Sequence, residues 1–156
     1  MRRKLAVAAA SLLVVGAGIA SMVASTSATA ATTLAVIEHA QNDRVTDVGR
    51  EGLGRGDLLT FRNPIYDQTN TTQVGTDQGF CIRLSKFKQN KSGSWECEWT
   101  TFLNDGASSI TVESPFYDTG TGVGAITGGT GAYVGASGSL DLSCSETECT
   151  FKFTLS

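Results

Sequence analysis

The sequence has few or none of three features, namely long apolar runs, histidine and proline. Each scarcity limits the possible structures or functions. Beyond residue 30 it has no apolar run long enough to cross a bilayer, which argues against stable membrane insertion. Its only histidine is His39, so neither a Ser-His-Asp triad nor a zinc ribbon can be argued, and no metal site is expected. Its only prolines, Pro64 and Pro115, both fall in predicted strands. We interpret Pro64 as a bulge and Pro115 as a strand end.

The first 30 residues have the features of an export signal. Arg2, Arg3 and Lys4 precede an apolar stretch from Leu5 to Ala20, and Ala28-Thr29-Ala30 offers a cleavage site. We expect cleavage after Ala30 and a secreted domain comprising residues 31–156. A retained membrane anchor is the alternative, disfavoured because serine and glycine interrupt the apolar stretch.

The sequence has more acidic than basic residues. The formal net charge is −3, and loss of the three cations of the leader would make the remaining domain more acidic. Such a domain is a poor partner for nucleic acid or for anionic lipid. The length left after cleavage suits one domain with a modest core.

The four cysteines are expected to form disulfides, because an even number in an exported chain is typical of them. Cys144 and Cys149 flank a short turn, and Cys81 and Cys97 flank another turn near residues 90–93. Facing strands bring such pairs within bonding distance. Of the three possible pairings we therefore favour 81–97 and 144–149.

Short runs of alternating apolar and polar residues, separated by glycine, asparagine and aspartate, predict an all-β fold of antiparallel strands closed into a sheet or barrel. Asn104-Asp105-Gly106 predicts a hairpin turn, and Gly128 to Gly131 a second turn. Residues 41–55 are expected to form a polar connection. The predicted strands are 33–40, 56–67, 74–87, 94–102, 108–116, 123–127, 138–144 and 149–155.

The alternation of faces selects two polar residues among apolar neighbours. Glu38 shares a face with Leu34 and Val36, where burial would raise its pKa and suit it to acid–base chemistry. A structural salt bridge with Arg83 or Arg62 is the open alternative. Asn63 lies among apolar residues too, either to bind a ligand oxygen or to fix the bulge at Pro64.

The same alternation predicts the wall of a ligand pocket. Cys81 and Arg83 share one face of their strand, and the disulfide to Cys97 would place Arg83 on the face of Trp95 and Trp99. The glycine-rich segment 128–138 lacks the lysine and the helix of a phosphate loop, so we interpret its glycines as structural. Glu96 and Glu98 are interpreted as solvated rather than catalytic.

Two segments carry a resemblance to the allene oxide cyclase family, whose barrel is shared with dirigent-like proteins. They are G-D-L…F-x-N-x-x-Y-D, from Gly56 to Asp67, continued by G-x-C at Gly79 to Cys81, and A-I-T-G-G-x-G, from Ala125 to Gly131. The resemblance implies an eight-stranded antiparallel β-barrel, a trimer, no cofactor, and cyclisation of an unstable fatty-acid epoxide.

Position by position, Glu38 resembles the family's buried glutamate, Asn63 its water-holding asparagine and Cys81 a cysteine of the pocket. Phe116 stands where the family has a pocket tyrosine, and Ala40 where it has a second asparagine. The predicted site therefore has Glu38 and Asn63 as catalytic residues and a pocket lined by Cys81, Arg83, Trp95, Trp99 and Phe116.

The sequence thus predicts a secreted, cofactor-free cyclase or isomerase acting on a small hydrophobic, oxygen-bearing molecule. The alternative is a dirigent-like or lipocalin-like protein that binds such a ligand without converting it.

Overall fold

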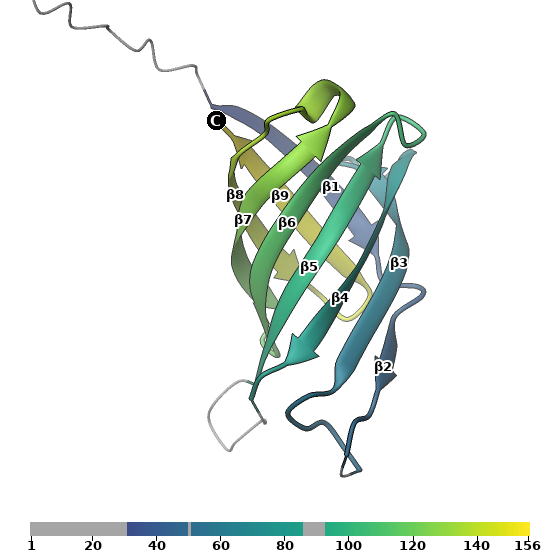
Figure 1. The fold of residues 1–156 in the computed structure, drawn as a ribbon. Coiled ribbons are helices and arrows are strands. Elements are labelled where there is room, and N and C mark those ends of the chain that lie inside the picture. Colours follow the sequence, from purple (N-terminus) through teal and green to yellow (C-terminus); the bar gives the residue numbers. More distant parts are fainter. Residues whose placement is uncertain (1–30, 50, 86–92) are drawn as a thin grey trace, which may run out of the picture.

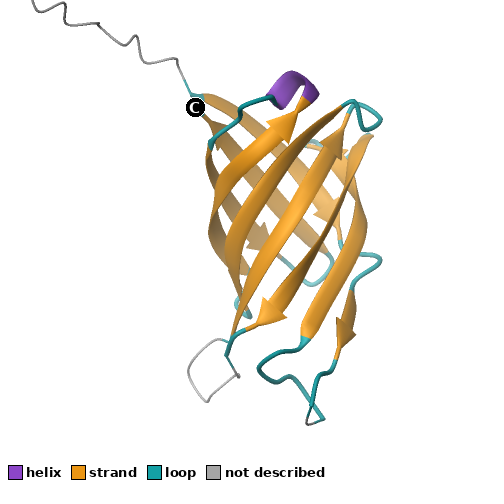
Figure 2. Ribbon diagram, in the orientation of Figure 1, coloured by secondary structure: helices purple, strands orange, loops and turns teal. Residues whose placement is uncertain are grey.

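The computed structural model describes residues 31–49, 51–85 and 93–156, and the predicted leader and the 90–93 turn lie wholly or largely outside them. The described residues form a closed antiparallel β-barrel (Figures 1 and 2). Its strands are β1 (Thr32–His39), β2 (Arg44–Thr46), β3 (Leu58–Asp67), β4 (Gln73–Arg83), β5 (Ser94–Leu103), β6 (Ser108–Tyr117), β7 (Thr121–Thr130), β8 (Gly138–Cys144) and β9 (Glu148–Leu155).

Eight strands form the ring, in agreement with the sequence prediction. Neighbours in sequence pair from β3 to β9, β9 pairs with β1, and β1 returns to β3. The sheet thereby closes on itself, because β1 pairs with both β9 and β3, which is how barrels avoid open edges. No helix within the described ranges is long and apolar enough to span a membrane.

The predicted connection at residues 41–55 contains an additional short strand. β1 and β2 pair with successive parts of β3, through Glu38 opposite Ile65 and Arg44 opposite Thr60. The chain between them leaves the sheet opposite Asn63 and Pro64. Since proline has no amide hydrogen to donate to the ladder, this is where an interruption costs least. β1 and β2 therefore behave as one strand that is interrupted where it faces Pro64 of β3.

Several predicted strand boundaries were wrong, and the largest differences lie at β7 and β4. β7 continues to Thr130 rather than ending at residue 127, and a 3₁₀ turn at Gly131–Tyr133 (η1) follows it. Gly129 is required by close packing, because a Cβ there would lie 2.5 Å from the carbonyl oxygen of Tyr133. β4 ends at Arg83, not at residue 87, which itself lies outside the described ranges. The hairpin at Asn104, Asp105 and Gly106 is confirmed, with positive φ at all three.

Both predicted disulfides are present, Cys81–Cys97 joining β4 to β5 and Cys144–Cys149 joining β8 to β9. Each pair is directly opposite in its ladder, as the positions of the cysteines on either side of a turn predicted. For Cys81–Cys97, whose sequence separation is 16, loop closure contributes about 3 kcal/mol to stability.

The interior is filled at one end only. Near the C-terminus the lumen is packed by fully buried side chains, namely Ile65, Ile110, Val112, Leu140 and Phe153. The opposite end, where the β8–β9 hairpin and the end of β6 lie, is less completely filled. Among the described residues, the space for a ligand inside the barrel therefore lies at that end.

Candidate functional site

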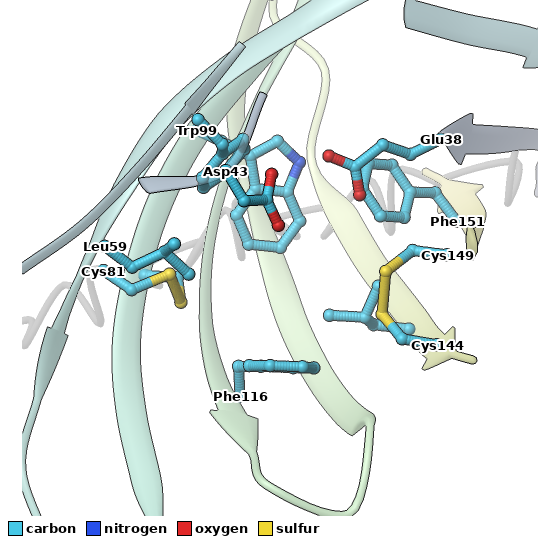
Figure 3. Close-up of a pocket in the computed structure, with 12 residues that line it drawn as sticks. Glu38, Asp43, Leu59, Cys81, Trp99, Phe116, Cys144, Cys149 and Phe151 are labelled. Carbon is cyan, nitrogen blue, oxygen red and sulfur yellow. A yellow bond between two sulfur atoms is a disulfide. The ribbon is translucent and has the colours of Figure 1, made fainter. Parts of the chain in front are cut away.

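A cavity of about 80 Å³ occupies the less filled end of the barrel (Figure 3). Several of its lining residues are only partly buried, so it opens to solvent. Its wall is mostly apolar and includes both disulfides, and two carboxylates enter it. The lining residues are Glu38, Asp43, Leu59, Phe61, Cys81, Cys97, Trp99, Phe116, Leu142, Cys144, Cys149 and Phe151.

Asn63 organises the polar side of this cavity. Its amide nitrogen donates to Oε1 of Glu38 at 2.6 Å and to Oδ1 of Asp43 at 2.7 Å. Its carbonyl oxygen accepts the backbone N–H groups of Gln41 and Asn42, at 3.1 and 2.8 Å. These four bonds use the full capacity of the amide, and they replace the ladder bonds lost beside Pro64. The amide orientation is consequently fixed, and Asn63 holds Glu38 in place.

Glu38 is buried, with 6% of its surface exposed, and no cation pairs with it among the described residues. The predicted alternative, a salt bridge to Arg83 or Arg62, is wrong. Arg62 lies on the outside of β3, and Arg83 is paired with Asp118. Burial raises the pKa of Glu38, partly offset by the Asn63 hydrogen bond, and the negative charge of Asp43 raises it further.

Asp77, which the sequence analysis did not select, completes the acidic group. It lies opposite Asn63 in the β3–β4 ladder and is fully buried. Its Oδ1 accepts the Asn63 backbone N–H at 3.3 Å, whereas its Oδ2 has no donor among the described residues. Burial and the neighbouring Glu38 carboxylate raise the pKa of Asp77 to about 9. An oxygen with no donor, next to a carboxylate, is best satisfied by carrying the proton itself.

The pKa values of both carboxyls are raised, so near neutral pH the pair favours holding one proton over ionising at both sites. Like charges so close in a buried site cannot both ionise without large cost. Such an arrangement can accept a proton at Glu38 and return it, with Asp77 as the adjoining donor.

A pH dependence of stability follows from Asp77. Its pKa is higher in the folded protein than its ordinary value of 3.8, so the folded state binds more protons between about pH 4 and 9. The free energy of unfolding should therefore fall as the pH rises through this window, by at most about 1.4 kcal/mol per pH unit for one group.

Urea unfolding at pH 5 and pH 8 measures this slope. The loss of stability on going to pH 8 should be smaller in Asp77→Asn than in the parent. Glu38 contributes in the same direction, because its pKa is also raised. Equal slopes in the two proteins would contradict the assignment of the buried proton.

The structure brings Cys81, Trp99 and Phe116 to the cavity wall but not the other two predicted pocket residues. Arg83, which is fully buried, donates to both oxygens of Asp118, at 2.9 and 2.7 Å. Trp95 donates its indole N–H to Asp118 at 3.3 Å, and the Arg83 guanidinium lies 4.9 Å from its ring centroid. Arg83 and Trp95 thus form an adjacent structural network. His39 lies outside the lumen, stacked on Tyr66 at 4.1 Å.

Sequence reasoning could have found Asp77, because strand alternation places it on the face of Cys81 and Arg83. Asp43 carried no such signal, since it lies in the break between β1 and β2. Within residues 31–49, 51–85 and 93–156 no group of three or more His, Cys, Asp or Glu side chains is arranged to hold a metal ion.

The comparisons with known proteins agree with this architecture. The model of the allene oxide cyclase family matches residues 28–153. The chain is similar to the solved structure of a pyocyanin demethylase, with a TM-score of 0.69 and 26% identity over 80% of this chain and 100% of that one.

Two more distant structures share the fold. A pterocarpan synthase dirigent protein matches with a TM-score of 0.65 and 17% identity, over 80% of this chain and 86% of its own. A Diels–Alderase from Streptomyces koyangensis matches with a TM-score of 0.56 and 13% identity, over 80% and 63%. Because the family model covers almost all of the barrel, we conclude that this protein belongs to the allene oxide cyclase family.

Proposed function

We propose that the open half of the barrel binds a small hydrophobic, oxygen-bearing molecule and isomerises it by proton transfer at Glu38. The observation that carries the proposal is the buried Glu38 carboxyl at the wall of a mostly apolar cavity, with the buried carboxyl of Asp77 as its neighbour. Perturbed carboxyls in a cavity are typical of acid–base sites. Family membership supports it, as does the similarity to pyocyanin demethylase, whose name describes an enzyme acting on a small molecule.

The proposed division of roles follows the contacts. Glu38 takes a proton from the substrate and returns it at another atom, so the product keeps the substrate's formula. Asp77 keeps its own proton and hydrogen-bonds Glu38, which stabilises the ionised base. Asn63 is a positioning residue, since all of its hydrogen bonds are to protein groups.

The size of the cavity limits how a ligand is bound. At about 80 Å³ it is smaller than the roughly 300–1,000 Å³ of sites that enclose a drug-sized ligand. We therefore infer that the reacting end of the molecule enters the barrel and that the rest extends through its open mouth, beside Phe116 and the Cys144–Cys149 disulfide.

The direct test is incubation of residues 31–156 with an extract of the producing cells, followed by mass spectrometry and NMR of the small molecules. The proposal predicts one compound depleted and an isomer of equal mass formed. A compound retained by the protein but recovered unchanged would favour the binding function instead. If no compound is either retained or converted, the proposed site is incorrect.

We also propose that the protein is exported and assembles as a homo-trimer. The two disulfides support export, because they persist in oxidising compartments. The outer wall at β4 supports assembly, because Phe80, Ile82 and Leu84 are 41–46% exposed there.

Replacing one of these outer residues tests the assembly. Phe80→Glu should lower the sedimentation coefficient toward that of a monomer, because a charge would enter a buried contact. Val134→Glu, a change at a residue 78% exposed beyond η1, is the matched control. A parent protein that already sediments as a monomer would refute the trimer.

A further inference from the structure

The cavity wall carries negative charge without positive charge. Glu38 and Asp43 both accept a hydrogen bond from the Asn63 side-chain nitrogen, at 2.6 and 2.7 Å, which holds the two carboxyls side by side. None of the twelve described lining residues is lysine, arginine or histidine. The one buried cation among the described residues, Arg83, is bound to Asp118 through both terminal nitrogens.

The rest of the wall suits a cation too. Aromatic rings from four strands line the same cavity, namely Phe61, Trp99, Phe116 and Phe151. The rings of Trp99 and Phe151 lie 5.6 Å apart. The faces of such rings attract cations, most strongly when water is excluded. Carboxylates beside aromatic rings are therefore complementary to a positive, apolar ligand.

A second, independent observation points to this wall as a place where a ligand would bind. Trp99 is 4% exposed, and its indole N–H has no hydrogen-bond partner among the described residues. Figure 3 shows this nitrogen on the side of the indole that faces the Glu38 carboxylate. A buried donor without an acceptor is costly, so a ligand acceptor at this point would stabilise the complex.

We propose that the ligand of this cavity is a hydrophobic organic cation, a protonated or alkylated amine, that places its charge between Glu38 and Asp43 and presents an oxygen to the Trp99 N–H. The inference rests on the proposed function and specifies its substrate class. It excludes carboxylic acids that enter charge first, because their carboxylate would meet two like charges and no cation.

Three probes of one shape test the charge preference. 2-Amino-1-phenylethanol is a cation at pH 7, 1-phenylpropan-1-ol is its neutral isostere, and 3-hydroxy-3-phenylpropanoate is the anionic counterpart. All three share the ring and the hydroxyl acceptor. Binding is measured on ¹⁵N-labelled protein from the indole N–H signals of Trp95 and Trp99, which the variant Trp95→Phe assigns.

We expect the cation to bind roughly tenfold or more tightly than the neutral alcohol, and the anion more weakly than either. The Trp99 signal should shift on binding, whereas the Trp95 signal, already bonded to Asp118, should not. In the double variant Glu38→Gln, Asp43→Asn the cation should lose its advantage while the neutral alcohol binds at least as well. Glu96→Gln, on the outer wall, is the control.

The outcomes separate this inference from the proposed function. Equal or tighter binding of the neutral alcohol or the anion, with a shift of Trp99, overturns the cation preference and leaves the cavity as a binding site. A preference for the cation that survives in the double variant also overturns it. If no probe shifts the Trp99 signal at millimolar concentration, both the inference and the ligand-binding site are refuted.

Discussion

Glu38→Gln should slow conversion of the barrel's substrate by about 10²- to 10⁴-fold, the range typical of a lost general acid or base. Glutamine keeps the size of the side chain and can still accept the Asn63 hydrogen bond, so the barrel should fold normally. It cannot take up a proton, which is the step assigned to Glu38. The effect should appear in kcat more than in KM, because the lost interaction forms during the reaction.

The measurement is the initial rate on the compound identified from the extract. Glu96→Gln removes a carboxylate from the outer wall and should leave the rate unchanged. Far-ultraviolet circular dichroism and thermal unfolding check that the variants fold alike. A Glu38→Gln rate within a factor of two of the parent would exclude Glu38 as the acid–base residue.

Asp118→Ala should lower the free energy of unfolding by about 3 kcal/mol, at the lower end of the cost of leaving a buried charge unpaired. The side chain of Arg83 is fully buried, and its one ion pair with a described residue is to Asp118, which is 22% exposed. The same carboxylate accepts hydrogen bonds from the Gly93 backbone and the Trp95 indole, which would also be lost. Arg83 lowers the pKa of Asp118, so the pair stays ionised until the pH falls below the ordinary range of a carboxyl.

Denaturant unfolding at pH 6 measures this loss. Asp141→Asn, at an exposed position on β8, is the control and should change stability by less than about 0.5 kcal/mol. The double variant Arg83→Met, Asp118→Ala should regain part of the loss, because no buried charge remains unpaired. If Asp118→Ala unfolds at the same denaturant concentration as the parent, the network does not contribute to stability.

The sequence predicted the site residues best where the prediction depends only on which face of a strand a residue occupies. Strand alternation turned Glu38 and Asn63 to the interior, because a strand has only two faces, and the turn between Cys81 and Cys97 placed these two cysteines opposite each other. The same rule of alternation places Asp77 on the face of Cys81 and Arg83, and so also directs it to the interior.

The rest depended on contacts that alternation does not encode. Which acid pairs with Arg83 is decided by the position of Asp118 after β6, a residue 35 positions away. Asp43 reaches the site because the chain leaves the sheet between β1 and β2. The position of that interruption depends on Pro64, which lies in a different strand, β3. Gly128 and Gly129 look like turn residues in sequence, but at Gly129 the structure needs a small residue for close packing.

The most direct test of the account is the protonation state of Asp77 at pH 7. Carbon-13 NMR of the side-chain carboxyls, with Asp77→Asn to identify the signal, reports it without knowledge of the substrate. The account predicts that Asp77 is a neutral acid at pH 7 and loses its proton near pH 9. An Asp77 carboxyl that is already ionised at pH 5 would contradict a shared proton with Glu38, and with it the proposed chemistry of the cavity.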